Sequence, residues 1–250
     1  MPAALEVEHL SKRFGSTLAL DDLAWRADVG AAVALFGPNG AGKTTLMRLC
    51  ATLLRPTHGV VRVLGLDAAR HGAAVRRRIA VLAHESWLYP DLSPRENLAF
   101  YARLFGVIDA PRRVDALIAH LGLGGWSHRP VRALSRGLVQ RCALARVLLH
   151  EPDVLFLDEP FAGLDLEARE LLCDVLRTAR QRGTTILMST HDVGLGLALC
   201  SAALVLVRGR IAWEGAVGTA DAAAFEAHYR ALVHQRDAGA HAGAPPTSAP

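Results

Sequence analysis

A glycine-rich stretch, "FGPNGAGKTT" (residues 36–45), follows directly on the apolar run "AAVAL". Residues 37–44 fit the pattern G-x-x-x-x-G-K-[ST], in which glycines let successive backbone N–H groups turn inward around phosphates. We expect Lys43 to reach the β- and γ-phosphates of a nucleotide and the Thr44 hydroxyl to ligate Mg²⁺. A helix that begins near Gly42 would add the positive end of its dipole. The predicted nucleotide-binding residues of this loop are Gly37, Pro38, Asn39, Gly40, Ala41, Gly42, Lys43, Thr44 and Thr45.

Two adjacent acids, Asp158 and Glu159, end the segment "VLFLDE". Carboxylates at the end of a buried strand are costly to desolvate unless a cation lies nearby. We expect Asp158 to hold Mg²⁺, directly or through water, and Glu159 to polarise and orient an attacking water. The alternative is a strand-end turn whose acids point into solvent, which the presence of Lys43 disfavours.

The segment "STHD" (residues 189–192) ends a further apolar run and contains His191. An isolated histidine usually has a structural role, but this one follows a third core strand that converges on the glycine loop. We therefore expect His191 to form a hydrogen bond that links the γ-phosphate to the attacking water.

The segment "LSRGLVQR" (residues 134–141) opens a predicted helix with Ser135 as its N-cap. Its apolar positions share one face, and nothing in their periodicity indicates a contact with a nucleotide. These positions are Leu138, Cys142, Ala145 and Leu149.

The elements that must position these residues are short, continuous apolar runs separated by helix-length segments. Such runs predict parallel strands covered on both faces, and hence an α/β fold. The first 35 or so residues alternate as strands do, and a helix is expected from Gly42 to about Leu53. The predicted core strands are residues 31–36, 79–83, 154–158, 184–189 and 202–207.

Between His84 and Ser135 no strand-like run occurs, and helical signals dominate. Ser93, Pro94 and Glu96 form an N-cap, a proline at the first helical position and an early acid. We expect a helical lobe, about residues 84–135, inserted into a domain that spans residues 1–236. Residues 237–250 are rich in Ala, Gly and Pro and are predicted to be a disordered tail.

The whole chain has 250 residues, of which 51% are hydrophobic, and a formal net charge of +4. The densest basic cluster, residues 76–78, is interpreted as a solvated helix face rather than a patch for nucleic acid or lipid headgroups. The four cysteines are far apart and form no CxxC pair, which is typical of reduced thiols in a cytosol. The first ten residues have neither a charged start nor a hydrophobic core, so we expect no secretory signal. The most apolar segment (residues 193–207) is too short to span a bilayer.

Five segments in one order, "GPNGAGKTT", "LSRGLVQR", "VLFLDEP", "AGLD" and "STHD", resemble the ATP-binding subunit of ABC transporters over residues 4–215. The resemblance implies a P-loop NTPase (RecA-like) core with an N-terminal antiparallel β-subdomain and an inserted α-helical subdomain. It also implies a homodimer that holds ATP and Mg²⁺ between its protomers. Ser135 and the Gly137 backbone would then bind the γ-phosphate on the partner, Phe14 would stack on adenine, and Asp165 would lie at the dimer interface. Phe14 as a strand-edge core residue is the alternative.

Three positions depart from the family pattern. Arg136 and Leu138 replace the usual glycine and glutamine of the "LSRGL" segment, so contacts around the partner's nucleotide differ. His84 replaces the glutamine that usually follows the strand at residues 79–83, and we expect it near ATP and Mg²⁺ with a charge that depends on pH.

The resemblance places the chain at the cytoplasmic face of the cell membrane as a peripheral ATPase that moves a separate permease, without nucleic acid. Trp87 and Tyr89 belong to the region that receives a coupling helix in this family, although local packing is the alternative. The chain is most similar to the heme exporter ATPase of cytochrome c maturation; a drug or lipid exporter ATPase is the second possibility. A soluble ABC-type ATPase would show tandem cassettes or a long coiled coil, and a non-hydrolytic regulator would lack Glu159 or His191.

Overall fold

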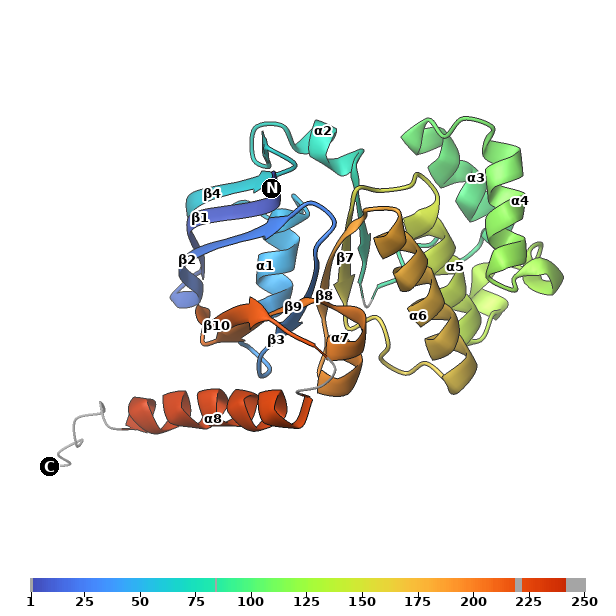
Figure 1. The fold of residues 1–250 in the computed structure, drawn as a ribbon. Helices are drawn as coiled ribbons and strands as arrows, with labels where there is room; N and C mark the ends of the chain where they lie inside the picture. Colours follow the sequence, from blue (N-terminus) through green and yellow to red (C-terminus); the bar gives the residue numbers. More distant parts are fainter. Residues whose placement is uncertain (1, 84, 219–221, 242–250) are drawn as a thin grey trace, which may run out of the picture.

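In the computed structural model, the described residues are 2–83, 85–218 and 222–241, so His84 and residues 242–250 lie outside the description. The chain forms two sheets with a helix between them and further helices on the outer face of the larger sheet (Figure 1). This architecture confirms the predicted α/β fold with an N-terminal antiparallel sheet.

The larger sheet has the strand order β10-β9-β3-β8-β7-β6. All neighbouring strands in it are parallel except β10, which runs antiparallel to β9. The carboxyl ends of the parallel strands therefore meet at one edge, where polar residues that follow different strands come together. The strands are β3 (Ala32–Phe36), β6 (Ile79–Leu82), β7 (Val154–Asp158), β8 (Thr185–Ser189), β9 (Ala202–Val207) and β10 (Arg210–Ala216).

The inner strands β3, β7, β8 and β9 of this sheet are buried on both faces, which explains why they are continuous apolar runs. In β3, Ala34 and Phe36 pack in one hydrophobic cluster, whereas Val33 and Leu35 pack in the other. Successive residues of such a strand face opposite sides of the sheet, and both sides are buried, so the strand needs apolar residues at every position.

The smaller sheet is antiparallel and has the order β2-β1-β4-β5. Helix α1 lies between the two sheets, and its buried residues share a cluster with both (Figure 1). It ends at Cys50 rather than near Leu53, because Thr52 adopts a left-handed φ of 62°. The elements are β1 (Ala3–Phe14), β2 (Thr17–Asp28), β4 (His58–Val63), β5 (Leu66–Asp67) and α1 (Lys43–Cys50).

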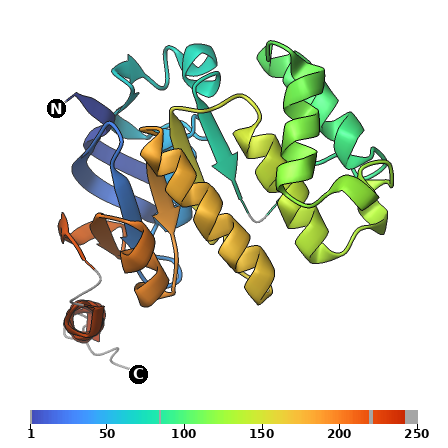
Figure 2. The ribbon, with the colours of Figure 1, turned by 45° about the vertical axis from the view of Figure 1, so that its right-hand side comes forward.

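The segment after β6 is helical, as its sequence predicts. Ser93 and Glu96 form a capping box at the start of α3, with Pro94 at the first position. Figure 2 shows α3 and α4 beside the sheet, joined to it through α5. The elements are α3 (Pro94–Phe105), α4 (Ala110–His120), the 3₁₀ turns Gly124–Trp126 and Val131–Ala133, and α5 (Arg136–Leu148).

The prediction of a disordered tail from residue 237 is wrong at its start. Residues 237–241 form the last turn of the C-terminal helix α8. Four of its apolar side chains pack against the core cluster: Phe225, Tyr229, Leu232 and Val233. The helix then continues to His241. The remaining helices are α2 (Gly72–Arg76), α6 (Leu166–Gln181), α7 (Val193–Leu199) and α8 (Ala222–His241).

Among the described residues, none of the helices combines the length and the apolar character that a membrane span requires.

Candidate nucleotide site

The glycine loop connects β3 to α1 at the carboxyl edge of the large sheet. Gly37 has a φ of +151°, and a Cβ on it would lie 2.3 Å from the Leu206 carbonyl oxygen. Gly42 has a φ of +103°, and a Cβ there would lie 2.5 Å from a methyl group of Leu20. Both positions need glycine, because any side chain would collide with neighbours and strain the backbone.

Lys43 places its ammonium at the centre of this loop. Its Nζ donates to the carbonyl oxygens of Gly37 (2.6 Å) and Pro38 (3.2 Å), and the residue is only 8% exposed. Burial lowers the pKa of Lys43, and the charges of Glu159 and Asp158 raise it in the opposite direction. A cation is thus held beside both acids, where the sequence predicts phosphate binding.

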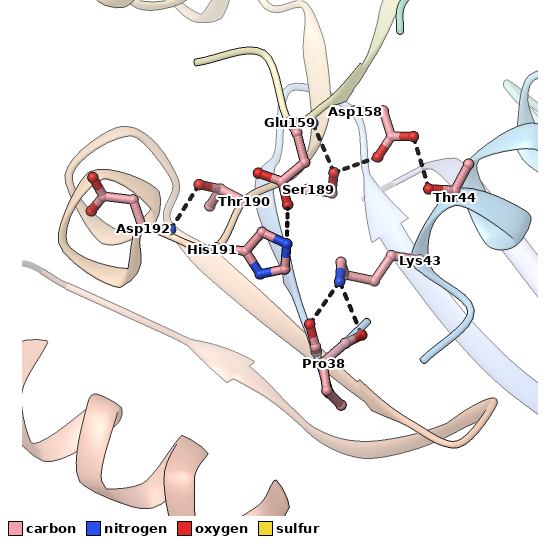
Figure 3. A network of polar contacts seen from close by, with 10 residues as sticks. Pro38, Lys43, Thr44, Asp158, Glu159, Ser189, Thr190, His191 and Asp192 are labelled. Atoms are coloured by element: carbon pink, nitrogen blue, oxygen red, sulfur yellow. Dashed lines mark hydrogen bonds and ion pairs between the residues drawn. The ribbon is translucent and has the colours of Figure 1, made fainter. Parts of the chain in front are cut away.

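Asp158 accepts two hydrogen bonds that fix its carboxylate (Figure 3). Thr44 Oγ1 donates to Oδ2 (2.8 Å), and Ser189 Oγ donates to Oδ1 (2.6 Å). Hydroxyl and carboxylate oxygens are the ligands that Mg²⁺ prefers. No group of three or more His, Cys, Asp or Glu side chains in the described part of the chain can hold a metal. This donor set therefore fits an ion that takes its other ligands from phosphates and water.

Glu159 is turned into the site by an unusual backbone. Its φ of +50° is left-handed, and its N–H donates to the carbonyl (3.2 Å) and the hydroxyl (3.0 Å) of Ser189. His191 Nε2 lies 3.0 Å from Glu159 Oε1. That approach does not have hydrogen-bond geometry, so the buried Oε1 has no hydrogen bond among the described residues. The strained turn aims the carboxylate where it can act on a ligand.

His191 lies on a short loop that side chains hold at both ends. Thr190 Oγ1 accepts from the Asp192 N–H (3.1 Å), and Asp192 caps α7 by accepting from the Leu195 N–H (2.9 Å). Asp192 also pairs with Arg169 (3.0 Å). Figure 3 shows the imidazole pointing toward Glu159.

These groups line one hollow of about 360 Å³. It contains most of the predicted loop residues, 39–45, together with Asp158, Glu159 and His191. Phe14 lies at its rim, 47% exposed, with Lys12 Nζ 5.0 Å from its ring centroid. An exposed ring beside a phosphate loop suits the predicted stacking role better than a core role.

The other predicted contacts form a second group, which does not line the hollow. Ser135 caps α5 by accepting from the Leu138 N–H (3.4 Å), which confirms its predicted N-cap role. Asp165 caps α6 by accepting from the Ala168 N–H (2.8 Å). A Cβ on Gly137 would lie 4.0 Å from Asp165 Oδ2. We call Ser135, Arg136, Gly137, Gly163 and Asp165 the signature group.

His84, predicted near ATP and Mg²⁺, lies outside the described residues. The residues on either side of it are connected to α5 through Arg146. Its guanidinium donates to the Val81 carbonyl (2.8 Å) and lies over the rings of Trp87 (5.3 Å) and Tyr101 (5.4 Å).

Two residues of the site were not predicted from the sequence. Ser189 pairs with Asp158 in the register of β7 and β8, so adjacent parallel strand ends were a usable signal. Tyr229 of α8 packs on Phe36, the residue before the loop (ring centroids 6.1 Å apart), and no local pattern pointed to it, because that helix was not predicted.

Comparisons with known proteins agree with this geometry. Residues 20–162 match the family described as "ABC transporter". The ABC transporter ATP-binding protein NatA of Bacillus subtilis (strain 168) is 34% identical over 202 residues, covering 80% of this chain and 82% of that protein. The Nod factor export ATP-binding protein I of Paraburkholderia xenovorans (strain LB400) is 38% identical, covering 86% and 71%. The daunorubicin resistance ATP-binding protein DrrA3 of Streptomyces coeruleorubidus is 40% identical, covering 85% and 68%.

Solved structures share the fold. One described as the ATP binding subunit of an ABC transporter has a TM-score of 0.82 at 29% identity, covering 91% of this chain and 94% of its own. A dimeric ATP-binding cassette in a post-hydrolysis state, bound to ADP and Pi, has a TM-score of 0.78 at 22% identity and covers 85% of this chain and 98% of its own.

Proposed function

Because this chain belongs to the ABC transporter family and is an ATP-binding, ATP-hydrolysing subunit, we propose that it powers an exporter by moving a separate membrane permease. The observation that carries the proposal is the convergence of Lys43, Asp158, Glu159 and His191 on one hollow. One protomer thus supplies the cation, the metal ligand, the general base and the histidine of the proposed reaction.

Each residue has a distinct part in the proposed reaction. Lys43 and the loop amides bind the β- and γ-phosphates, and Thr44 and Asp158 hold Mg²⁺, which neutralises phosphate charge when bound. Glu159 orients the attacking water and accepts its proton. His191 bonds to the γ-phosphate and keeps the Glu159 carboxylate in place.

The signature group supports a dimer as the working form. Ser135 and Arg136 are exposed and do not line the hollow of their own chain. We infer that they meet the nucleotide held by a second copy, with Asp165 at the interface and Phe14 against adenine. Binding of ATP then closes the dimer, and hydrolysis releases it.

The names of the relatives favour an organic small molecule as the exported cargo, because two of them are named for Nod factor export and daunorubicin resistance. None of the three relatives is named for heme. Heme export, which the sequence segments suggested, stays a prediction.

The test is to isolate the chain from native membranes in detergent and to reconstitute it with its co-purifying membrane protein in vesicles. We expect ATP hydrolysis that rises with the permease and rises further with an organic cargo such as daunorubicin. Stimulation by hemin alone would favour heme export. Recovery of the chain with ribosomes and without membrane protein would contradict the proposal, and Glu159→Gln in the same vesicles controls for contaminating ATPases.

A further inference from the structure

Helix α5 lies between the large sheet and the helical segment that follows β6 (Figure 2). Its later turns are buried, and the exposed fractions of Cys142, Leu144 and Val147 do not exceed 4%. The start of the helix is different, because Ser135 and Arg136 of the signature group are exposed. The contacts of the buried turns therefore decide where the signature group lies.

The buried turns of α5 contact the free edge of the large sheet. Strand β6 is last in the strand order and pairs with β7 on its other side. Arg146 Nη2 donates to the Val81 carbonyl (2.8 Å), and His150 Nε2 contacts the Ile79 carbonyl (2.9 Å). Apolar packing is not directional, whereas hydrogen bonds require a defined geometry. These two contacts therefore fix the rotation of α5 about its own axis.

Arg146 is a buried cation without a carboxylate partner. Its residue is 6% exposed, and it forms no ion pair with any acid in the described part of the chain. Its Nε has no hydrogen bond there either, and its guanidinium lies over the rings of Trp87 (5.3 Å) and Tyr101 (5.4 Å). An unpaired buried charge is costly, and apolar residues often replace buried charges with little loss of stability. The directional contact with Val81 explains a cation here better than stability does.

We propose that Arg146 is a positioning residue for the signature group. Its bond to Val81 sets the direction of α5, and hence the place at which Ser135 meets the nucleotide of the partner protomer. At 1.5 Å per residue, Ser135 lies roughly 16 Å from Arg146 along the helix axis. A small rotation at Arg146 thus moves the signature group and leaves the hollow of the same chain unchanged. This proposal rests on the ATP-sandwich dimer proposed above.

The test is Arg146→Met, which keeps a side chain of similar length beside the rings and removes both the charge and the donor to Val81. We expect the protein concentration that gives half-maximal hydrolysis to rise about tenfold, while the ATP affinity of dilute protein stays within about twofold. The melting temperature should change little, because the lost hydrogen bond and the relieved burial of charge act in opposite directions. Arg103→Met, at an exposed position of α3, is the matched control and should change none of these values.

Arg146→Lys is the conservative variant. Lysine keeps a cationic donor for Val81 but lacks the planar fork that stacks between two rings. Its half-maximal concentration should therefore lie between those of the unchanged protein and of Arg146→Met. Where the methionine variant yields no folded protein, the lysine variant decides, and a value equal to that of the unchanged protein would overturn the proposal.

A folded Arg146→Met protein with an unchanged dependence on protein concentration would also overturn it. So would a parallel loss of ATP affinity in dilute protein, because that result would assign Arg146 to the general stability of the chain. Failure of the dimer itself is recognised in the unchanged protein, whose rate per chain would then not depend on protein concentration. That result would remove the dimer and this role of Arg146 together.

Discussion

The nucleotide hollow and the signature group differ in how many of their polar groups have hydrogen-bond or ion-pair partners within one chain. In the hollow, Thr44, Asp158 and Ser189 form a continuous hydrogen-bonded chain, and Lys43 is buried against loop carbonyls. In the signature group, the Arg136 guanidinium is exposed and has no hydrogen bond or ion pair within the part of the chain that the structure describes; it rests over Gly163, where a Cβ would lie 2.9 Å from it.

This difference indicates that the hollow is prepared to bind a ligand within one chain, whereas the signature group is prepared to contact a second chain. The hollow is preorganised, so its dipoles and charges need little rearrangement when a triphosphate binds. The signature group presents a hydroxyl and a cation to the outside, where a second protomer can meet them. Changes in the hollow should therefore act in one chain, whereas changes in the signature group should act only when two chains meet.

Glu159→Gln tests the proposed role of the hollow in hydrolysis and should have the largest effect. Loss of the general base is expected to lower the rate of hydrolysis by about 10²–10⁴-fold while ATP still binds. An ATP-bound dimer should then accumulate, which size-exclusion chromatography with ATP and Mg²⁺ detects. Glu170→Gln, on the exposed side of α6, is the control; a Glu159→Gln protein that stays monomeric would count against the ATP-sandwich dimer.

Lys43→Ala tests the binding half of the hollow. Removing charge-assisted bonds to two phosphates should weaken ATP binding by about 10²–10⁴-fold, since each bond contributes about 1.5–3 kcal/mol. Nucleotide titration measures the affinity, and Arg48→Ala removes an exposed positive charge from the same helix as a control. An unchanged affinity would refute the phosphate-loop role.

Ser135→Asp tests the signature group alone. Aspartate keeps the N-cap of α5, but its charge should repel the partner's γ-phosphate. We expect ATP binding by dilute, monomeric protein to be unchanged and hydrolysis at high protein concentration to fall about tenfold or more. An equal loss of ATP binding and of hydrolysis would mean that the nucleotide hollow and the signature group do not act separately.

A substitution of His150 tests the contact between the helical segment and the core, and we expect it to have the smallest effect of the four. It stacks on Phe105 (3.9 Å) and contacts the Ile79 carbonyl (2.9 Å). Burial lowers the pKa of His150 below its ordinary 6.5, the hydrogen bond to Ile79 raises it, and Arg146 lowers it.

The unfolded chain therefore binds more protons at this position than the folded chain. The free energy of unfolding should fall as the pH drops through about 6.5 toward the lower folded pKa. His150→Gln should make the melting temperature less dependent on pH between 7 and 5. If the melting temperatures of the variant and of the unchanged protein fall equally between pH 7 and 5, His150 does not contribute to the acid sensitivity of the fold.

Local sequence determined the core strands and the residues at their ends. Short apolar runs such as residues 154–158 favour buried strands, and the glycine spacing before Lys43 predicts a phosphate loop, because both patterns depend on neighbours within a few positions. The caps at Ser93 and Ser135 were predictable for the same reason. The binding roles of Phe14, His84, Ser135, Gly137 and Asp165 came only from resemblance and remain predictions.

Only the tertiary structure decided which distant groups touch. Thr44 and Asp158 lie 114 positions apart, and their hydrogen bond depends on the strand order of the large sheet. The left-handed turn at Glu159 depends likewise on Ser189 of the next strand. Helix α8 was not predicted, and its packing on Phe36, which places Phe225 and Tyr229 beside the residue that precedes the phosphate loop, follows from the fold alone.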